Sequence, residues 1–129
     1  MITVTKKFSF CYGHFLPGYI GKCANQHGHN SELEVEVSGH PQGGYHPQGG
    51  YPSMVIDFGI LKSAVLPILE KVDHTNLNDS LPEWALPPTA EHLAHWFGIE
   101  IQNALAQYNI SVERVRLSET PTSWAEWRP

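Results

Sequence analysis

The chain has 129 residues, with 13 acidic and 8 basic side chains and a net charge of −5 when its histidines are neutral. It has no basic cluster suited to nucleic acid, and no apolar run approaches the roughly 20 residues that a membrane-spanning helix needs. The length predicts one domain over residues 1–129 with a buried core. The chain has two cysteines and no hydrophobic signal segment, so we expect free thiols and a cytoplasmic protein. A small molecule is the expected partner.

Two segments in the N-terminal third alternate apolar and polar residues, which is the pattern of half-buried strands. The first covers residues 2–10 and the second residues 31–38, where three glutamates occupy the polar face. The apolar positions are Ile2, Val4, Phe8 and Phe10 in the first segment and Leu33, Val35 and Val37 in the second. We expect the two strands to pair antiparallel through the loop that carries Cys23.

That connection is rich in side chains that bind metals: Cys23-Ala-Asn-Gln-His27-Gly-His29, with His14 upstream. On an extended chain residues i and i+2 project to the same face, so the imidazoles of His27 and His29 can converge on one ion. Three imidazoles suit zinc and leave a coordination position open for water or substrate, as in catalytic sites. Cys23 has two interpretations. It is either a fourth ligand that closes a structural site, or a reactive thiolate favoured by the adjacent Lys22.

Residues 40–51 are a tandem duplication of His-Pro-Gln-Gly-Gly-Tyr. Its prolines and glycines preclude regular structure, so we interpret it as an extended hairpin loop. Met54–Ile56 should then resume as a short strand.

The remaining sequence predicts two helices and a final strand. Asp57 is placed to cap the first helix, which contains Pro67 and should end near Asp73-His74. The second helix should start at Thr89, and residues 112–118 should form the last strand. This order predicts an α+β fold, with helices on one face of a mainly antiparallel sheet. The other face carries glutamates and arginines, which cross-strand pairing or solvent exposure would satisfy.

Two further positions are candidates for chemistry. Asp73 falls at the expected C-terminal end of a helix, where a carboxylate is disfavoured and a protonated His74 is favoured. An exposed helix end is the simpler interpretation of this pair. Glu119 closes the last strand before a Thr-Pro turn, where an isolated glutamate is more often a surface residue than a ligand.

Several motifs follow one another along nearly the whole chain. They are His14, Cys23-x-x-x-His27-Gly28-His29-Asn30, residues 55–62, Asp73-His74-x-x-Leu77-Asn78, residues 88–91 and Glu119-Thr120. Together they resemble the 6-pyruvoyltetrahydropterin synthase family, including its bacterial branch of 6-carboxy-5,6,7,8-tetrahydropterin synthases. The tail over residues 119–127 resembles that bacterial branch, whereas the duplicated loop departs from the usual pattern.

The resemblance implies a role for each matching residue. The implied zinc ligands are His14, His27 and His29. The implied catalytic and binding residues are Cys23 as proton acceptor, Asp73 and His74 as a proton relay, and Glu119 as the anchor of the pterin. The implied architecture is the tunnelling fold, in which subunits join their sheets into a barrel. The assembly is typically a homohexamer with active sites between subunits.

The implied reaction converts 7,8-dihydroneopterin triphosphate into 6-carboxy-5,6,7,8-tetrahydropterin, acetaldehyde and triphosphate, in 7-deazapurine and queuosine synthesis. Three alternatives remain. The first is 6-pyruvoyltetrahydropterin synthesis, which eliminates triphosphate without cleaving the side chain. The second is a folate-pathway variant, which resembles this group but carries glutamate where Cys23 stands. The third is a zinc-binding protein without catalysis.

Overall fold

The computed structural model describes residues 1–41 and 53–129. Most of the duplicated segment, from residue 42 to residue 51, lies outside the described residues, so its interpretation as a hairpin loop stays a prediction.

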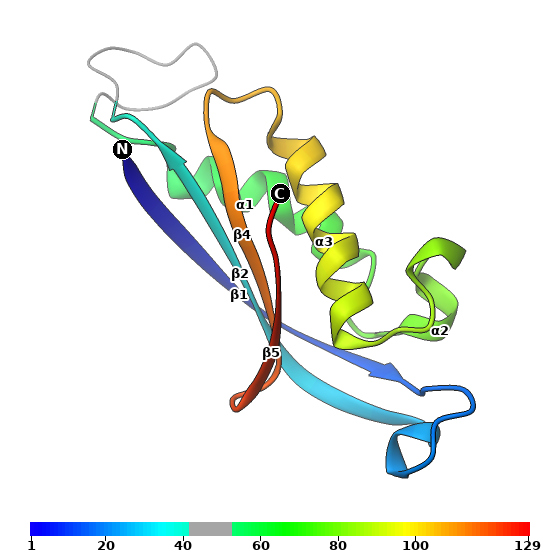
Figure 1. The fold of residues 1–129 in the computed structure, drawn as a ribbon. Coiled ribbons are helices and arrows are strands. Elements are labelled where there is room, and N and C mark those ends of the chain that lie inside the picture. Colours follow the sequence, from blue (N-terminus) through cyan, green and yellow to red (C-terminus); the bar gives the residue numbers. More distant parts are fainter. Residues whose placement is uncertain (42–52) are drawn as a thin grey trace.

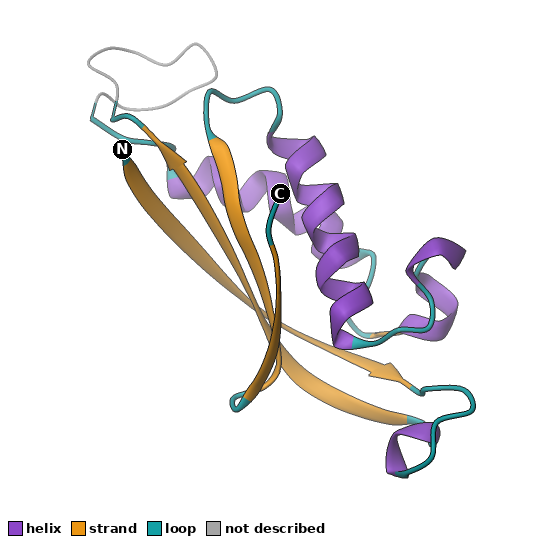
Figure 2. Ribbon diagram, in the orientation of Figure 1, coloured by secondary structure: helices purple, strands orange, loops and turns teal. Residues whose placement is uncertain are grey.

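A twisted five-stranded sheet forms the framework of the molecule (Figure 1). Its order is β3-β1-β2-β4-β5, with β3 parallel to β1 and every other neighbouring pair antiparallel. The strands are β1 (Ile2–His14), β2 (His27–Gly39), β3 (Thr75–Asn76), β4 (Ser111–Thr120) and β5 (Ser123–Trp127). The long strands β1 and β2 continue past the region that the helices cover (Figure 2).

Two long helices cover one face of this sheet, α1 (Phe58–Glu70) and α3 (Ala90–Leu105) (Figure 1). Phe97 of α3 meets Phe10 of β1 edge-on, with ring centroids 5.6 Å apart. The short elements are η1 (Lys22–Ala24), α2 (Leu77–Ser80) and η2 (Glu83–Ala85). The predicted α+β class is therefore confirmed, as is the placement of the helices on one face of the sheet.

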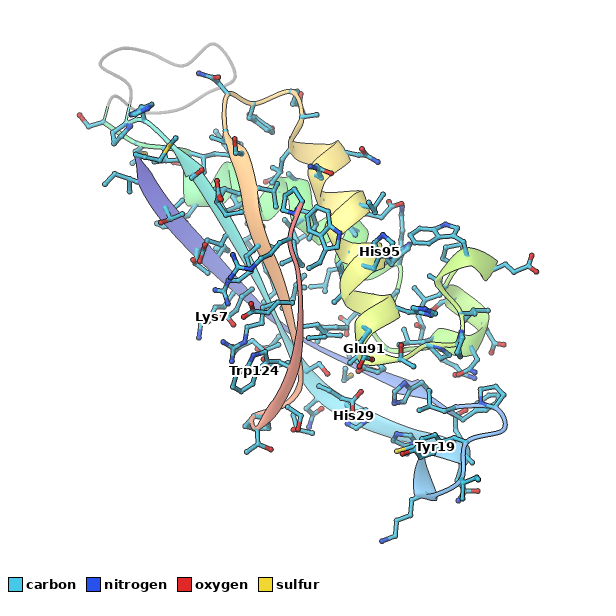
Figure 3. The ribbon with its side chains drawn as sticks, in the orientation of Figure 1. Lys7, Tyr19, His29, Glu91, His95 and Trp124 are labelled. Atoms are coloured by element: carbon cyan, nitrogen blue, oxygen red, sulfur yellow. The ribbon has the colours of Figure 1, made fainter. Side chains whose placement is uncertain are left out.

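The apolar positions of the second strand and Phe8 and Phe10 of the first are buried in the core as predicted, whereas Ile2 is exposed and Val4 only partly buried. Leu33, Val35 and Val37 are fully buried under the helices. Figure 3 shows Lys7 and Trp124 on the side of the sheet away from α3, which carries His95.

The polar face of the sheet is held by ion pairs between neighbouring strands. In the β2–β4 register, Glu34 lies opposite Arg116 and Glu36 opposite Arg114. The Arg116 Nε–Glu34 Oε2 distance is 3.1 Å, and the Arg114 Nη2–Glu36 Oε2 distance is 3.3 Å. The expected cross-strand pairing of these charges is thus confirmed.

The predicted cap at Asp57 is present, and Thr89, where the sequence predicts the start of the second helix, caps α3. Asp57 accepts hydrogen bonds from the amides of Gly59 and Ile60 at 2.6 and 3.2 Å, and Thr89 Oγ1 accepts one from the amide of His92 at 3.2 Å. Each cap satisfies backbone donors that have no partner inside the helix.

The first two strands are longer than expected, since β1 extends to His14 and β2 begins at His27. Three further boundaries differ from the sequence expectation. Met54–Ile56 form a bend and not a strand, because Val55 and Ile56 bury their side chains without pairing to the sheet. Helix α1 ends at Glu70, before Asp73, since the amides of Lys71 and Val72 turn back to carbonyls three residues earlier. The strand at 112–118 is not the last, because β5 follows it and pairs with β4.

Within the described residues, neither α1 nor α3 combines the length and the apolar character that crossing a bilayer would require.

The packing of β5 on α3 depends on a glycine. A Cβ atom added to Gly98 would overlap the indole ring of Trp127. We predict that Gly98→Ala lowers the free energy of unfolding by about 1–3 kcal/mol, because the ring must move out of a close-packed site. Urea unfolding monitored by fluorescence measures this change.

The control is the same substitution in a Trp127→Leu background, where the smaller side chain should reduce the loss. Alanine is the better helix former by about 1 kcal/mol. A stabilised Gly98→Ala protein would therefore contradict the proposed overlap.

Candidate active site

Three histidines converge where β1 and β2 meet the loop that joins them. The β1–β2 register places His14 opposite His27, and Tyr12 opposite His29. Because residues of equal parity share a strand face, all three imidazoles project from the helix-covered side. One ring nitrogen from each lies within 4.8 Å of the other two, and the ring centroids are 4.5 to 5.1 Å apart. We call His14, His27 and His29 the trihistidine cluster.

Backbone carbonyls orient two of these rings. His14 Nδ1 lies 2.7 Å from the Pro88 carbonyl oxygen, and His27 Nδ1 lies 2.7 Å from that of Asn25. A carbonyl accepts only from a protonated nitrogen, so in the neutral rings Nε2 carries the free lone pair. This pattern of outer hydrogen bonds is typical of histidines that bind metals.

Two nitrogens of the cluster are buried without a hydrogen bond to any described residue, His14 Nε2 and His29 Nε2. His14 is 2% exposed. A buried nitrogen left unpaired costs free energy, and a metal ion would satisfy it. The donor set therefore fits a divalent ion such as zinc with three protein ligands.

The surroundings keep His29 in the form that binds metals. Burial lowers the pKa of His29, the imidazoles of His14 and His27 lower it further, and Glu119 opposes the shift. A neutral imidazole is the ligand that a metal requires.

Glu119 lies beside the trihistidine cluster, near the end of β4. Its Oε1 is 3.5 Å from His29 Nε2, and its backbone carbonyl accepts a hydrogen bond from Ser31 Oγ at 3.3 Å. The structure thus brings the predicted pterin anchor to the predicted metal ligands.

Cys23 lies in η1, four residues before His27, and is partly buried. Its carbonyl accepts a hydrogen bond from the Leu16 amide at 2.8 Å, which closes the loop. Its sulfur is not among the donors of the trihistidine cluster. Its chemical role stays a prediction.

The side chains of Asp73 and His74 lie in close contact, away from the trihistidine cluster. Asp73 Oδ1 is 2.9 Å from His74 Nδ1 and also accepts the Cys11 amide at 3.1 Å. His74 has a left-handed backbone, with φ of 58°, and its amide donates to the Cys11 carbonyl at 2.7 Å. Because this turn has left the helix, Asp73 can orient the adjacent imidazole directly.

A cavity of about 660 Å³ opens on the polar face of the sheet, and the Asp73–His74 pair lines it. It is also lined by Cys11, Glu34 and Arg116, but not by the trihistidine cluster, Cys23 or Glu119. Within one chain, the candidate metal ligands and the candidate relay pair therefore lie on opposite faces of the sheet. Sequence reasoning missed Cys11, since a single polar-face cysteine in a strand carries no motif.

Comparison with known proteins assigns the chain to a family. The model of the family described as 6-pyruvoyl tetrahydropterin synthase matches residues 3–129. A Haemophilus influenzae protein named 6-carboxy-5,6,7,8-tetrahydropterin synthase is 34% identical and is aligned over 99% of each chain. A Drosophila melanogaster protein named 6-pyruvoyl tetrahydrobiopterin synthase is 32% identical over 84% of this chain and 62% of its own.

The fold agrees with this assignment. The solved structure of Caenorhabditis elegans 6-pyruvoyl tetrahydropterin synthase superimposes with a TM-score of 0.80, at 24% identity, covering 99% of this chain and 95% of that one. The architecture is thus the tunnelling fold of a pterin-processing lyase. The chain belongs to the 6-pyruvoyl tetrahydropterin synthase family.

We predict that His27→Ala abolishes stable metal binding at the trihistidine cluster, because two imidazoles alone leave the ion short of protein ligands. Elemental analysis of the purified protein gives the metal content. The matched control is His95→Ala, which removes an exposed imidazole on α3. A His27→Ala protein that retains a full complement of metal would disprove the assignment of this ligand.

Proposed function

We propose that this protein is a zinc-dependent 6-carboxytetrahydropterin synthase. It converts 7,8-dihydroneopterin triphosphate and one water molecule into 6-carboxy-5,6,7,8-tetrahydropterin, acetaldehyde and triphosphate, in queuosine and other 7-deazapurine synthesis. The observation that carries the proposal is the trihistidine cluster with its unpaired buried nitrogens, next to the Glu119 carboxylate. The 34% identity to the Haemophilus protein over 99% of the chain supports the choice of product.

His14, His27 and His29 would hold the zinc ion. When bound, zinc acts as a Lewis acid that stabilises negative charge developing on the oxygens of the substrate side chain.

The protein supplies the proton-transfer groups. Cys23 removes a proton from the side-chain carbon as a thiolate. His74 donates and accepts protons, and its contact with Asp73 at 2.9 Å fixes the tautomer of the ring. The side chain of His74 is 78% exposed, so it is open to a substrate that enters from outside its own chain.

Glu119 selects the pterin ring. The amino-pyrimidinone edge of a pterin offers two parallel N–H groups, and a carboxylate accepts both in one plane. This contact orients the ring so that its side chain extends toward the trihistidine cluster.

We further propose that each active site is shared between two subunits of a homohexamer. One subunit contributes the trihistidine cluster, Cys23 and Glu119, and its neighbour contributes Asp73 and His74. The opposite-sided placement of these groups within one chain supports this division. The outer edges of β5 and of residues 2–10 of β1 have no partner strand within the described residues, and such edges join readily. In this proposal residues 1–129 form one domain and the enzyme works in the cytoplasm.

The decisive test is incubation with 7,8-dihydroneopterin triphosphate followed by mass spectrometry. We expect 6-carboxytetrahydropterin and acetaldehyde from the wild-type protein. Cys23→Ala should keep its metal and its fold but lose turnover, because the proton acceptor is gone. A 6-pyruvoyl product would place the protein in the other branch. An unchanged substrate with metal-loaded protein would favour zinc binding without catalysis.

The shared site makes a separate prediction. The Cys23→Ala and His74→Ala proteins should each be inactive. When the two are unfolded together and reassembled, about a quarter of the sites would combine the intact Cys23 of one subunit with the intact His74 of its neighbour. Activity should therefore return to roughly that fraction of the wild-type rate. Mixing without subunit exchange is the control. If the reassembled mixture stays inactive while wild-type protein recovers, the two groups belong to one chain.

A further inference from the structure

A second set of metal-binding side chains lies at the polar-face cavity. The Cys11 sulfur, a carboxylate oxygen of Asp73 and a ring nitrogen of His74 all lie within 4.8 Å of one another. We propose that this Cys11–Asp73–His74 cluster is a second metal site, which binds a thiophilic divalent ion such as Zn²⁺. This site is separate from the trihistidine cluster and uses the thiol that the proposed reaction leaves idle.

Hydrogen bonds hold these three residues together before any ion arrives. The Cys11 amide donates to Asp73 Oδ1 at 3.1 Å, and the Cys11 carbonyl accepts the His74 amide at 2.7 Å. Asp73, which is 62 positions from Cys11 in the sequence, and its neighbour His74 are thus both bonded to the backbone of Cys11. Because the backbone is already positioned, binding an ion orders little more than side-chain torsions.

The donors match the chemistry of zinc. Thiolate, imidazole and carboxylate are all common zinc ligands, and water can complete a tetrahedron. Bond lengths of about 2.0–2.3 Å place two ligands of one ion roughly 3.3–3.7 Å apart. The Asp73 Oδ1–His74 Nδ1 separation of 2.9 Å is already close to this range. The exposed His74 ring is free to turn toward the thiol.

The charges of the cavity also favour a cation. Both basic residues that line it are engaged with glutamates: Lys7 Nζ is 3.4 Å from Glu32 Oε1, and Arg116 Nε is 3.1 Å from Glu34 Oε2. Asp73 adds a further carboxylate, so the lining carries one more acidic than basic side chain.

Occupation of this site would engage the relay pair. An ion held by Asp73 and His74 would remove both from proton transfer, so excess zinc would inhibit the enzyme. That consequence rests on the proposed function, whereas the binding itself does not.

The test uses protein that carries one zinc ion per chain, which leaves the proposed second site open, and titrates it with Co²⁺, whose bond to a thiolate gives a near-ultraviolet charge-transfer band. We expect wild-type protein to bind one additional ion per chain and to develop this band. Cys11→Ser should lose both, whereas Cys23→Ser, the matched control, should keep both. His27→Ala should also keep the band, because it disrupts only the trihistidine cluster.

A second variant covers the case in which Cys11→Ser fails to fold. His74→Asn removes the imidazole, and asparagine tolerates the left-handed backbone. It should weaken cobalt binding by roughly tenfold or more through the loss of a ligand. The proposal is overturned if wild-type protein binds no additional ion, or if His74→Asn binds it as tightly as wild type. It is also overturned if the band disappears in Cys23→Ser and persists in Cys11→Ser. None of these readouts depends on turnover of a pterin.

Discussion

The candidate chemistry depends on the antiparallel pairing of β1 with β2. This register sets His14 opposite His27 and brings His29 to the same face. A shift by one residue would turn the imidazoles of one strand to the other side of the sheet, along with every apolar side chain of that strand. The buried alternation of Leu33, Val35 and Val37 therefore fixes both the core and the position of the candidate metal ligands. Stability and site geometry are set by the same pairing.

The two faces of the sheet divide the functional groups. The helix-covered face holds the trihistidine cluster and Glu119, where burial withdraws His29 from solvent and lowers its pKa. The polar face holds Asp73 and His74 at the edge of an open cavity. A sheet one layer thick separates these sets inside a chain, so an assembly of chains is the natural way to bring them together.

The features that sequence reasoning predicted correctly are local ones. Strand alternation, the cap at Asp57, the start of the second helix near Thr89, and the spacing of His27 and His29 involve residues a few positions apart, whose geometry the backbone fixes. The missed features depend on distant contacts. β5 owes its existence to pairing with β4 and to packing of Trp127 on Gly98. The early end of α1, by contrast, goes with the amides of Lys71 and Val72, which bond to carbonyls three residues earlier. The position of Cys11 beside Asp73 and His74 follows from bonds between β1 and the turn at 73–74. The roles of the individual site residues came from family resemblance and remain predictions.

The ladder of glutamates and arginines across β2 and β4 bears on how subunits associate. Glu34 is buried within this ladder, and Arg114 and Arg116 lie within ion-pair distance of carboxylates, so the surface is ionic and its charges are paired. Such a charged surface would gain little free energy by packing against another copy of itself. It is well suited to line a water-filled channel. Cohesion of a closed ring would then come from main-chain amides and carbonyls at the strand edges. The circumference of the ring would follow from the twist and tilt of the strands, with little influence from the apolar area buried between subunits.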